Sequence, residues 1–126
     1  MKVGINGFGR IGRSVFRILE DVDSIEVVAI NDLFDNDALR YLLSYDTVMG
    51  PFGRSLVLEG DEFVTDKSRV KLLSERNPAD IPWGDLGVDA VVEATGVFRQ
   101  REQLEQHLTA GADRVVLTVP SKDPVD

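Results

Sequence analysis

Short apolar runs alternate along this chain with longer segments in which apolar residues recur at helical spacing. Runs of this kind predict buried strands, and their alternation with helical segments is typical of parallel strands joined by helices. We therefore expect an α/β fold, a doubly wound parallel sheet with its ligand at the carboxyl ends of the strands. The predicted parallel strands are Lys2–Asn6, Ile25–Asn31, Arg69–Ser74, Val88–Glu93 and Arg114–Thr118.

Three segments between these strands have the periodicity of amphipathic helices, with apolar residues at i, i+3 and i+4. An acidic stretch, Asp35-Asn36-Asp37, can cap the second of them. The apolar stripes are Ile11, Val15, Ile18 and Leu19 in a helix over about Arg10–Glu20, Leu39, Leu42 and Leu43 in a short helix, and Leu104 and Leu108 in a helix over Gln100–Leu108.

The region between the second and third parallel strands breaks this alternation. Tyr45–Gly53 contains two glycines and a proline and is predicted to be a loop. Arg54–Leu58 and Glu62–Thr65, joined by a short turn, predict a small inserted hairpin. The strand order 3-2-1-4-5-6 expected for this fold would place a sixth strand after Asp126, so we expect the sheet to be truncated before its last strand.

Composition supports a globular domain and narrows the classes of partner. The 126 residues are 43% hydrophobic, which is enough for one domain with its own core. The net charge of −8 argues against nucleic acid and membrane surfaces as partners, because both attract basic proteins. Cysteine is absent, which excludes disulfides, thiolate metal sites and a cysteine nucleophile within this chain. No signal peptide precedes the first strand, so we expect a cytoplasmic protein.

The first strand runs directly into a glycine motif of the form G-x-G-x-x-G. Gly7 would allow the tight turn, Gly9 would let the backbone approach a pyrophosphate, and Gly12 would let the following helix pack close to the strand. Free N–H groups at Arg10 and Ile11 would then point toward the phosphates. The alternative is a glycine-rich turn that binds nothing.

An aspartate at the end of the second strand favours the ligand-binding interpretation. Asp32 lies twenty residues after Gly12, where this fold places an acid that binds the adenosine ribose hydroxyls. A carboxylate there would repel the 2′-phosphate of NADP, and the neighbouring Leu33 offers no cation to receive it. The sequence therefore predicts NAD as the cofactor, and the alternative for Asp32 is a solvated turn residue.

Further short motifs follow in a fixed order along the chain. They are Ile5–Arg13, Asn31-Asp32-Leu33, Tyr45-Asp46-Thr47, Pro82-Trp83-Gly84 with Gly87-Val88-Asp89, and Glu93–Phe98. Together they resemble the amino-terminal, NAD-binding part of phosphorylating glyceraldehyde-3-phosphate dehydrogenase, and the likeness covers essentially the whole chain. The resemblance implies that residues 1–126 form one NAD-binding domain, without the catalytic domain.

The resemblance also implies which residues contact the cofactor. Residues 8–11 would line the pyrophosphate, Arg76 would lie near the adenine, and Thr118 with Val119 would approach the nicotinamide. The alternatives are an exposed ion-pairing arginine for Arg76, a core aromatic for Phe98 and a strand-end hydroxyl for Thr118. The full expected set is Asn6, Gly7, Phe8, Gly9, Arg10, Ile11, Gly12, Asn31, Asp32, Leu33, Arg76, Thr95, Gly96, Phe98 and Thr118.

By the same resemblance, the whole enzyme would be a homotetramer that oxidises and phosphorylates the small phosphorylated aldehyde glyceraldehyde 3-phosphate. A thiolate would attack the aldehyde, hydride would pass to NAD, and phosphate would cleave the resulting thioester to give 1,3-bisphosphoglycerate. The catalytic cysteine and its histidine would lie beyond Asp126, so no catalytic residue and no metal ligand is expected here. The single histidine, His107, is predicted to be a solvated helix residue, and Trp83 to fill the core.

Two other functions remain open from the sequence. One is a dehydrogenase of the same superfamily that acts on erythrose 4-phosphate, and the other is a nucleotide-binding module without chemistry. Asp32 and the stretch Trp83–Gly87 favour the glyceraldehyde-3-phosphate enzyme, while the absence of cysteine is compatible with the module.

Overall fold

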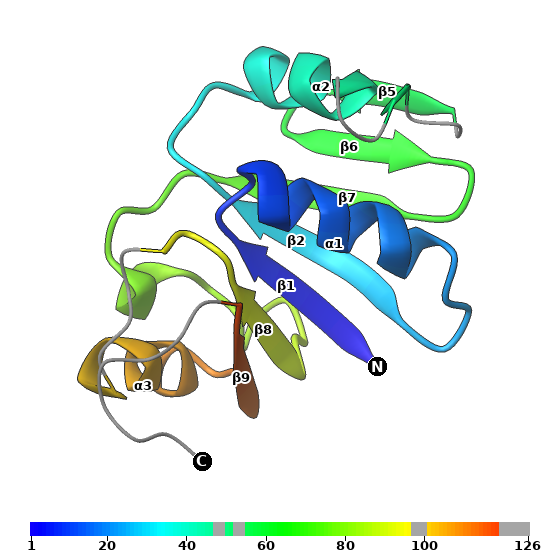
Figure 1. The fold of residues 1–126 in the computed structure, drawn as a ribbon. Coiled ribbons are helices and arrows are strands. Elements are labelled where there is room, and N and C mark those ends of the chain that lie inside the picture. Colours follow the sequence, from blue (N-terminus) through cyan, green and yellow to red (C-terminus); the bar gives the residue numbers. More distant parts are fainter. Residues whose placement is uncertain (47–49, 52–54, 97–100, 119–126) are drawn as a thin grey trace.

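The computed structural model describes residues 1–46, 50–51, 55–96 and 101–118 and confirms the predicted fold class (Figure 1). All five predicted parallel strands are present, and they lie side by side in the expected order 3-2-1-4-5 within a seven-stranded sheet ordered β5-β6-β7-β2-β1-β8-β9. The parallel strands are β1 (Lys2–Asn6), β2 (Glu26–Asn31), β7 (Arg69–Leu73), β8 (Ala90–Glu93) and β9 (Arg114–Leu117).

The predicted hairpin is present and extends this sheet. β5 (Leu56–Glu59) and β6 (Glu62–Thr65) pair antiparallel, and β6 in turn pairs antiparallel with β7, so the hairpin covers the outer edge of β7. The predicted loop that precedes it is partly wrong. Tyr45–Asp46 (β3) and Gly50–Pro51 (β4) form a short antiparallel pair of their own, because their backbone groups pair with each other.

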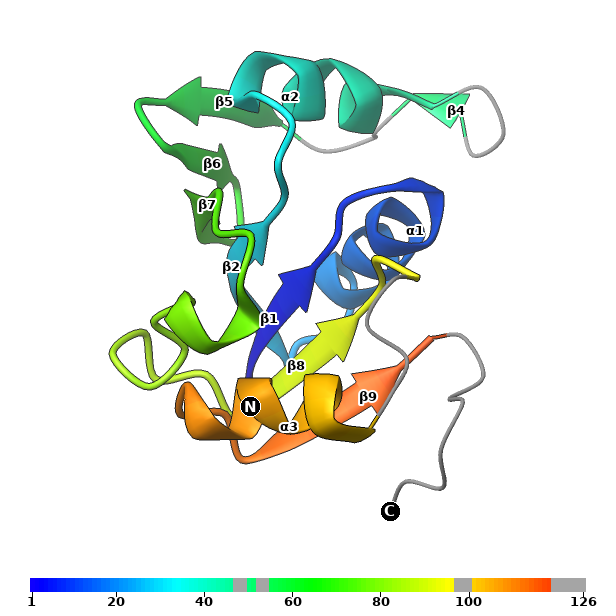
Figure 2. The same ribbon diagram turned by 90° about the vertical axis from the view of Figure 1, so that its left-hand side faces the viewer.

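Helices cover both faces of the sheet (Figure 2). α1 (Arg10–Glu20) and α2 (Asn36–Ser44) pack on one face, over a core that includes Ile5, Phe16, Val27, Ile30, Leu39, Leu43, Phe63 and Val70. α3 (Arg101–Thr109) and a 3-10 turn (Pro78–Asp80) lie on the other face, over Ala29, Ile81, Trp83, Val88, Val91 and Ala112. In the part of the chain described, no helix has the length and apolar character needed to cross a membrane.

Half of the apolar stripe predicted for α1 packs on the core, namely Val15 and Leu19, and the buried face is rotated away from the other half. Gly12, Phe16 and Glu20 are buried, whereas Ile11 is 45% and Ile18 60% exposed. The cause is the close approach of the helix to the first strand at Gly12, which sets the phase of the helix although glycine carries no hydrophobic signal. In α3 the prediction is likewise half wrong, because Leu104 is buried but Leu108 is exposed.

The opposite face is built around Trp83, whose side chain is fully buried as predicted. The indole lies against Gly4 in the middle of β1, so closely that a Cβ at Gly4 would collide with the ring. The glycine in this strand thus leaves the room that the largest core side chain occupies.

A lysine from the loop after β6 closes the carboxyl end of α1. The Nζ of Lys67 donates hydrogen bonds to the carbonyl oxygens of Leu19 (3.0 Å), Val22 (2.7 Å) and Ile25 (3.0 Å). Leu19 is in the last turn of α1, Val22 and Ile25 follow the helix, and a positive charge is favourable at this end of its dipole. Lys67 therefore joins the end of α1 to the start of β2.

Lys67→Met should lower the free energy of unfolding by about 2 kcal/mol, because it removes three charge-assisted hydrogen bonds from a half-buried position. Urea denaturation measures this loss. The matched control is Lys71→Met: the side chain of Lys71 is 40% exposed and lowers the pKa of Asp61 by hydrogen bonding to it at 2.7 Å, but water screens this pair. Equal denaturation midpoints for the two variants would contradict the role given to Lys67.

Candidate cofactor-binding site

A cleft of about 430 Å³ opens at the carboxyl ends of the parallel strands. It lies where the connections after β1 and β8 diverge, the position at which doubly wound sheets bind their ligands. Residues that follow β1, β2, β7 and β8 all contribute to its walls. The lining residues are Asn6, Gly7, Gly9, Asn31, Asp32, Leu33, Phe34, Glu75, Arg76, Ala94 and Thr95.

The three glycines of the motif have different structural roles. Gly7 has φ +98°, and a Cβ there would lie 2.7 Å from the backbone nitrogen of Thr95. A Cβ on Gly12 would collide with the carbonyl oxygen of Gly7, so this glycine is what allows the helix to approach the turn. At Gly9 the space is open, because no atom lies within 4 Å of the point that a Cβ would occupy, and φ has an ordinary value of −74°. The fold therefore requires glycine at Gly7 and Gly12 but not at Gly9.

The helix that follows the turn begins at the cleft. Gly9 is its N-cap and lines the cleft; no side chain caps the helix and its first turn contains no acid, so the amino end keeps its electropositive character. Arg10 and Ile11 are exposed there. Phe8 is different, since its side chain is fully buried and packs edge-on against Phe16, which leaves only its backbone near the cleft.

Asp32 joins the end of β2 to the glycine turn. One carboxylate oxygen accepts the N–H of Phe8 at 2.6 Å, and the other accepts the N–H of Phe34 at 2.9 Å. The backbone N–H of Gly7 also donates to the carbonyl of Asn31 at 2.8 Å. A half-buried negative charge is thereby held at the edge of the cleft, beside the exposed apolar side chains of Leu33 and Phe34.

Only some of the remaining predicted residues line the cleft. Arg76 and Thr95 line the cleft, whereas Gly96 follows with φ +78°. Thr118 lies at the end of β9, where its hydroxyl and N–H both donate to the Glu93 carbonyl at 3.0 and 3.2 Å, and it does not line the cleft. Phe98 and Val119 lie outside the described residues. The cleft itself brings together Asn6, Gly7, Gly9, Asn31, Asp32, Leu33, Arg76 and Thr95 from the predicted set.

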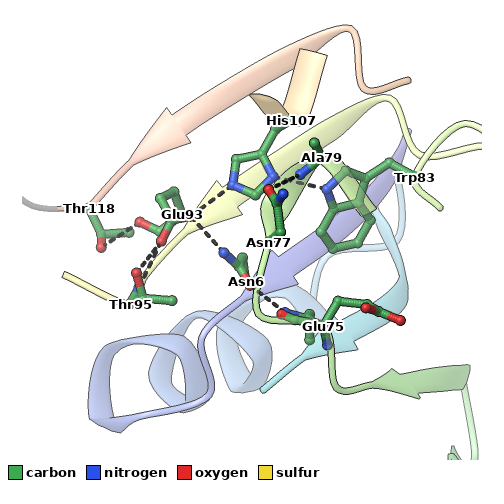
Figure 3. Close-up of polar contacts among 10 residues, drawn as sticks. Asn6, Glu75, Asn77, Ala79, Trp83, Glu93, Thr95, His107 and Thr118 are labelled. Carbon is green, nitrogen blue, oxygen red and sulfur yellow. Dashed lines mark hydrogen bonds and ion pairs between the residues drawn. The ribbon is translucent and has the colours of Figure 1, made fainter. Parts of the chain in front are cut away.

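Polar side chains at the carboxyl ends of neighbouring strands form a network that sequence reasoning missed (Figure 3). The Glu93 carboxylate accepts Nδ2–H of Asn6 at 2.7 Å on one oxygen, and the N–H and hydroxyl of Thr95 at 3.0 and 2.6 Å on the other. Asn6 Oδ1 accepts Nδ2–H of Asn31 at 2.8 Å. Asn31 also pairs with the backbone of Glu75 in both directions, at 2.9 and 2.8 Å. We call this set, completed by His107, the carboxyl-end network.

The prediction that His107 is a solvated residue is wrong. Its ring is fully buried, with Nδ1 3.0 Å from Nε1 of Trp83 and Nε2 2.8 Å from the Glu93 carboxylate (Figure 3). An indole N–H can only donate, so Nδ1 must be the acceptor and Nε2 carries the proton that Glu93 accepts. The available signal was position: Asn6, Asn31 and Glu93 each end a buried strand with a polar side chain.

The strand, glycine turn and helix around this cleft, with an acid at the end of the next strand, define a doubly wound dinucleotide-binding domain. The family model described as the glyceraldehyde 3-phosphate dehydrogenase NAD binding domain matches residues 1–101. The chain belongs to this family, whose cofactor is NAD.

Individual relatives agree with the family match. Glyceraldehyde-3-phosphate dehydrogenase of Streptomyces coelicolor is 49% identical over 98% of this chain and 37% of its own length. The enzyme of the same name from Chlamydia pneumoniae is 49% identical over 99% of this chain and 38% of its own length. Glyceraldehyde-3-phosphate dehydrogenase A of Escherichia coli K12 is 47% identical over 98% of this chain and 37% of its own length. The chain thus spans a little more than a third of these relatives.

The glycine geometry predicts that one motif position can be filled without loss of the fold. Gly9→Val should melt close to the unsubstituted protein, at a cost of about 1 kcal/mol for the poorer N-cap, and should weaken NAD binding at least tenfold by occupying the cleft. Gly12→Val should instead unfold at much lower temperature. Calorimetric titration and melting curves measure both effects, and retained affinity in a folded Gly9→Val protein would show that Gly9 is only a turn residue.

Proposed function

We propose that residues 1–126 are the cofactor domain of a phosphorylating glyceraldehyde-3-phosphate dehydrogenase and bind NAD in the cleft described above. The observation that carries the proposal is the glycine turn held to the end of β2 by Asp32, at 2.6 Å from the Phe8 N–H, with the amino end of α1 open beside it. This arrangement supplies backbone donors for a pyrophosphate and a carboxylate for ribose hydroxyls within one cleft.

The residues lining the cleft suggest how each part of the cofactor is held. The N–H groups at Arg10 and Ile11 bind the pyrophosphate, and Asp32 binds the adenosine ribose. Arg76 and Leu33 face the adenine, and Thr118 is on the nicotinamide side. Bound NAD supplies the hydride acceptor of the reaction, while this domain supplies position and electrostatics.

NAD is preferred over NADP in this proposal because of the charge in the cleft. Asp32 and Glu75 contribute two negative charges to its lining, and Arg76 contributes one positive charge, which leaves a net charge of −1 (1 − 2). The 2′-phosphate of NADP would add further negative charge close to Asp32 and would be repelled.

The activity of the whole protein is part of the same proposal. A cysteine nucleophile outside residues 1–126 would attack glyceraldehyde 3-phosphate, and the product after phosphate attack would be 1,3-bisphosphoglycerate. We propose that this enzyme is a cytoplasmic homotetramer. The names of the relatives support the glyceraldehyde-3-phosphate substrate, and no observation favours erythrose 4-phosphate or a module without chemistry.

Calorimetric titration should find that NAD binds at least tenfold more tightly than NADP. Asp32→Ala should narrow the difference between the two affinities, because the 2′-phosphate of NADP is no longer repelled by this carboxylate. Adding Arg76→Ala to that variant should widen the difference again, because it removes the single positive charge among the lining residues described. Melting curves of the Asp32→Ala protein monitor the loss of the two backbone hydrogen bonds to Asp32. NADP binding as tight as NAD binding in the unsubstituted protein would contradict the proposal.

The purified chain of residues 1–126 should reduce no NAD in the presence of glyceraldehyde 3-phosphate and phosphate, because it contains no cysteine to form the thioester. Absorbance of NADH measures this. The full-length protein assayed under the same conditions is the positive control, and aldehyde-dependent NADH formation by the short chain would refute the assignment of the chemistry to another part of the enzyme.

A further inference from the structure

The carboxylate of Glu93 is fully buried, yet it lies next to the cleft rather than in it. Four donors meet it: Nε2–H of His107, Nδ2–H of Asn6, and both the N–H and the hydroxyl of Thr95. One of these donors belongs to Asn6 and two belong to Thr95, and both residues line the cleft. We propose that Glu93 is a positioning residue that fixes the walls of the NAD cleft, an inference that rests on the proposed function.

The charge of Glu93 sets the direction of the hydrogen bonds that it receives. An ionised carboxylate only accepts, so Asn6 must turn its NH₂ group toward Glu93 and its carbonyl oxygen toward Asn31. Asn31 turns its NH₂ group toward Asn6 and its oxygen toward the N–H of Glu75, and the backbone of Glu75 requires the same orientation. On the floor of the cleft, Glu93 thus orients the amide of Asn6, which is in turn matched to the amide of Asn31.

The same chain of contacts reaches the opposite wall. Asn31 pairs with both backbone groups of Glu75, at 2.9 and 2.8 Å, and this holds the segment that places Arg76 in the cleft. On the near wall, the backbone N–H of Thr95 is held at 3.0 Å by the second carboxylate oxygen. Glu93 therefore acts on both walls through residues that line the proposed NAD cleft.

Trp83 and His107 form the part of the network outside the cleft, and their hydrogen bonds run in one direction, from Trp83 through His107 to Glu93. Trp83 can only donate, so its bond to Nδ1 keeps the proton of His107 on Nε2 and directs it at Glu93. Neither Trp83 nor His107 lines the cleft. His107 is consequently a donor to Glu93 that can be removed without altering any residue of the binding surface.

Glutamine has nearly the shape of glutamate but cannot satisfy this site. If its NH₂ group replaces the oxygen that faces Asn6 and His107, it meets two N–H donors. If it replaces the other oxygen, it meets the backbone N–H of Thr95, which cannot reorient. Either orientation leaves at least one buried donor opposed by another donor.

The test compares Glu93→Gln with Glu20→Gln. Glu20 is an equally buried carboxylate at the last residue of α1, where one oxygen accepts the Thr65 hydroxyl at 3.1 Å and the other has no partner among the residues described. Calorimetric titration of full-length protein should give at least tenfold weaker NAD binding for Glu93→Gln and a change of less than twofold for Glu20→Gln. NMR without NAD should show shifted side-chain amide signals for Asn6 and Asn31 and a shifted indole signal for Trp83 in Glu93→Gln alone.

His107→Leu keeps the experiment decisive if Glu93→Gln fails to fold. It removes one of the four donors from outside the cleft and should weaken NAD binding three- to fivefold. Folded Glu93→Gln or His107→Leu protein that binds NAD as tightly as the unsubstituted protein would overturn the proposal, as would an equal loss in Glu20→Gln. If the unsubstituted protein does not bind NAD, the proposed function fails, and unmoved Asn6 and Asn31 signals in Glu93→Gln would then separately refute the positioning role.

Discussion

Burying a charge is costly unless donors replace the water that it loses, and four donors meet this requirement at the Glu93 carboxylate. The donors that meet it come from the end of β1, from the residues just after β8, and from α3. Through Asn6 and Asn31 the same requirement reaches the ends of β2 and β7. The backbone hydrogen bonds of the sheet align these strands, and the carboxyl-end network orients the polar groups that line the cleft beyond them.

The three glycines of the motif meet different steric limits. Two of them are required by the fold, and the third is free to serve the ligand. Gly7 and Gly12 are confined by neighbouring backbone atoms, so their lack of a side chain is a condition of folding. Gly9 meets no such limit, and it lies on the wall of the cleft. One short motif thus combines two physical requirements that a sequence alone presents as equivalent.

The sequence predicted the parts of the fold that depend on local pattern. Apolar runs located the five parallel strands, Asp35 capped α2 through the N–H of Ala38, and the glycine motif located the turn. The errors arose where long-range packing decides. Gly12 set the phase of α1 without a hydrophobic signal, and the hydrogen bond from Asn6 to Glu93 joins residues 87 positions apart, which no local pattern reveals. His107 was misplaced for the same reason, because its partners come from other elements.

The order of the strands makes one wall of the cleft depend on residues distant in sequence. β1 pairs with β2, and β2 with β7, across shorter stretches of chain than the one that separates β8 from its partner β1. Closing so long a loop carries the larger entropic cost. Glu93 is the last residue of β8 and Thr95 follows it, so one wall of the cleft and the charge that orders it depend on this long-range pairing. A nucleotide that contacts both walls would therefore stabilise the domain where its chain connectivity contributes least.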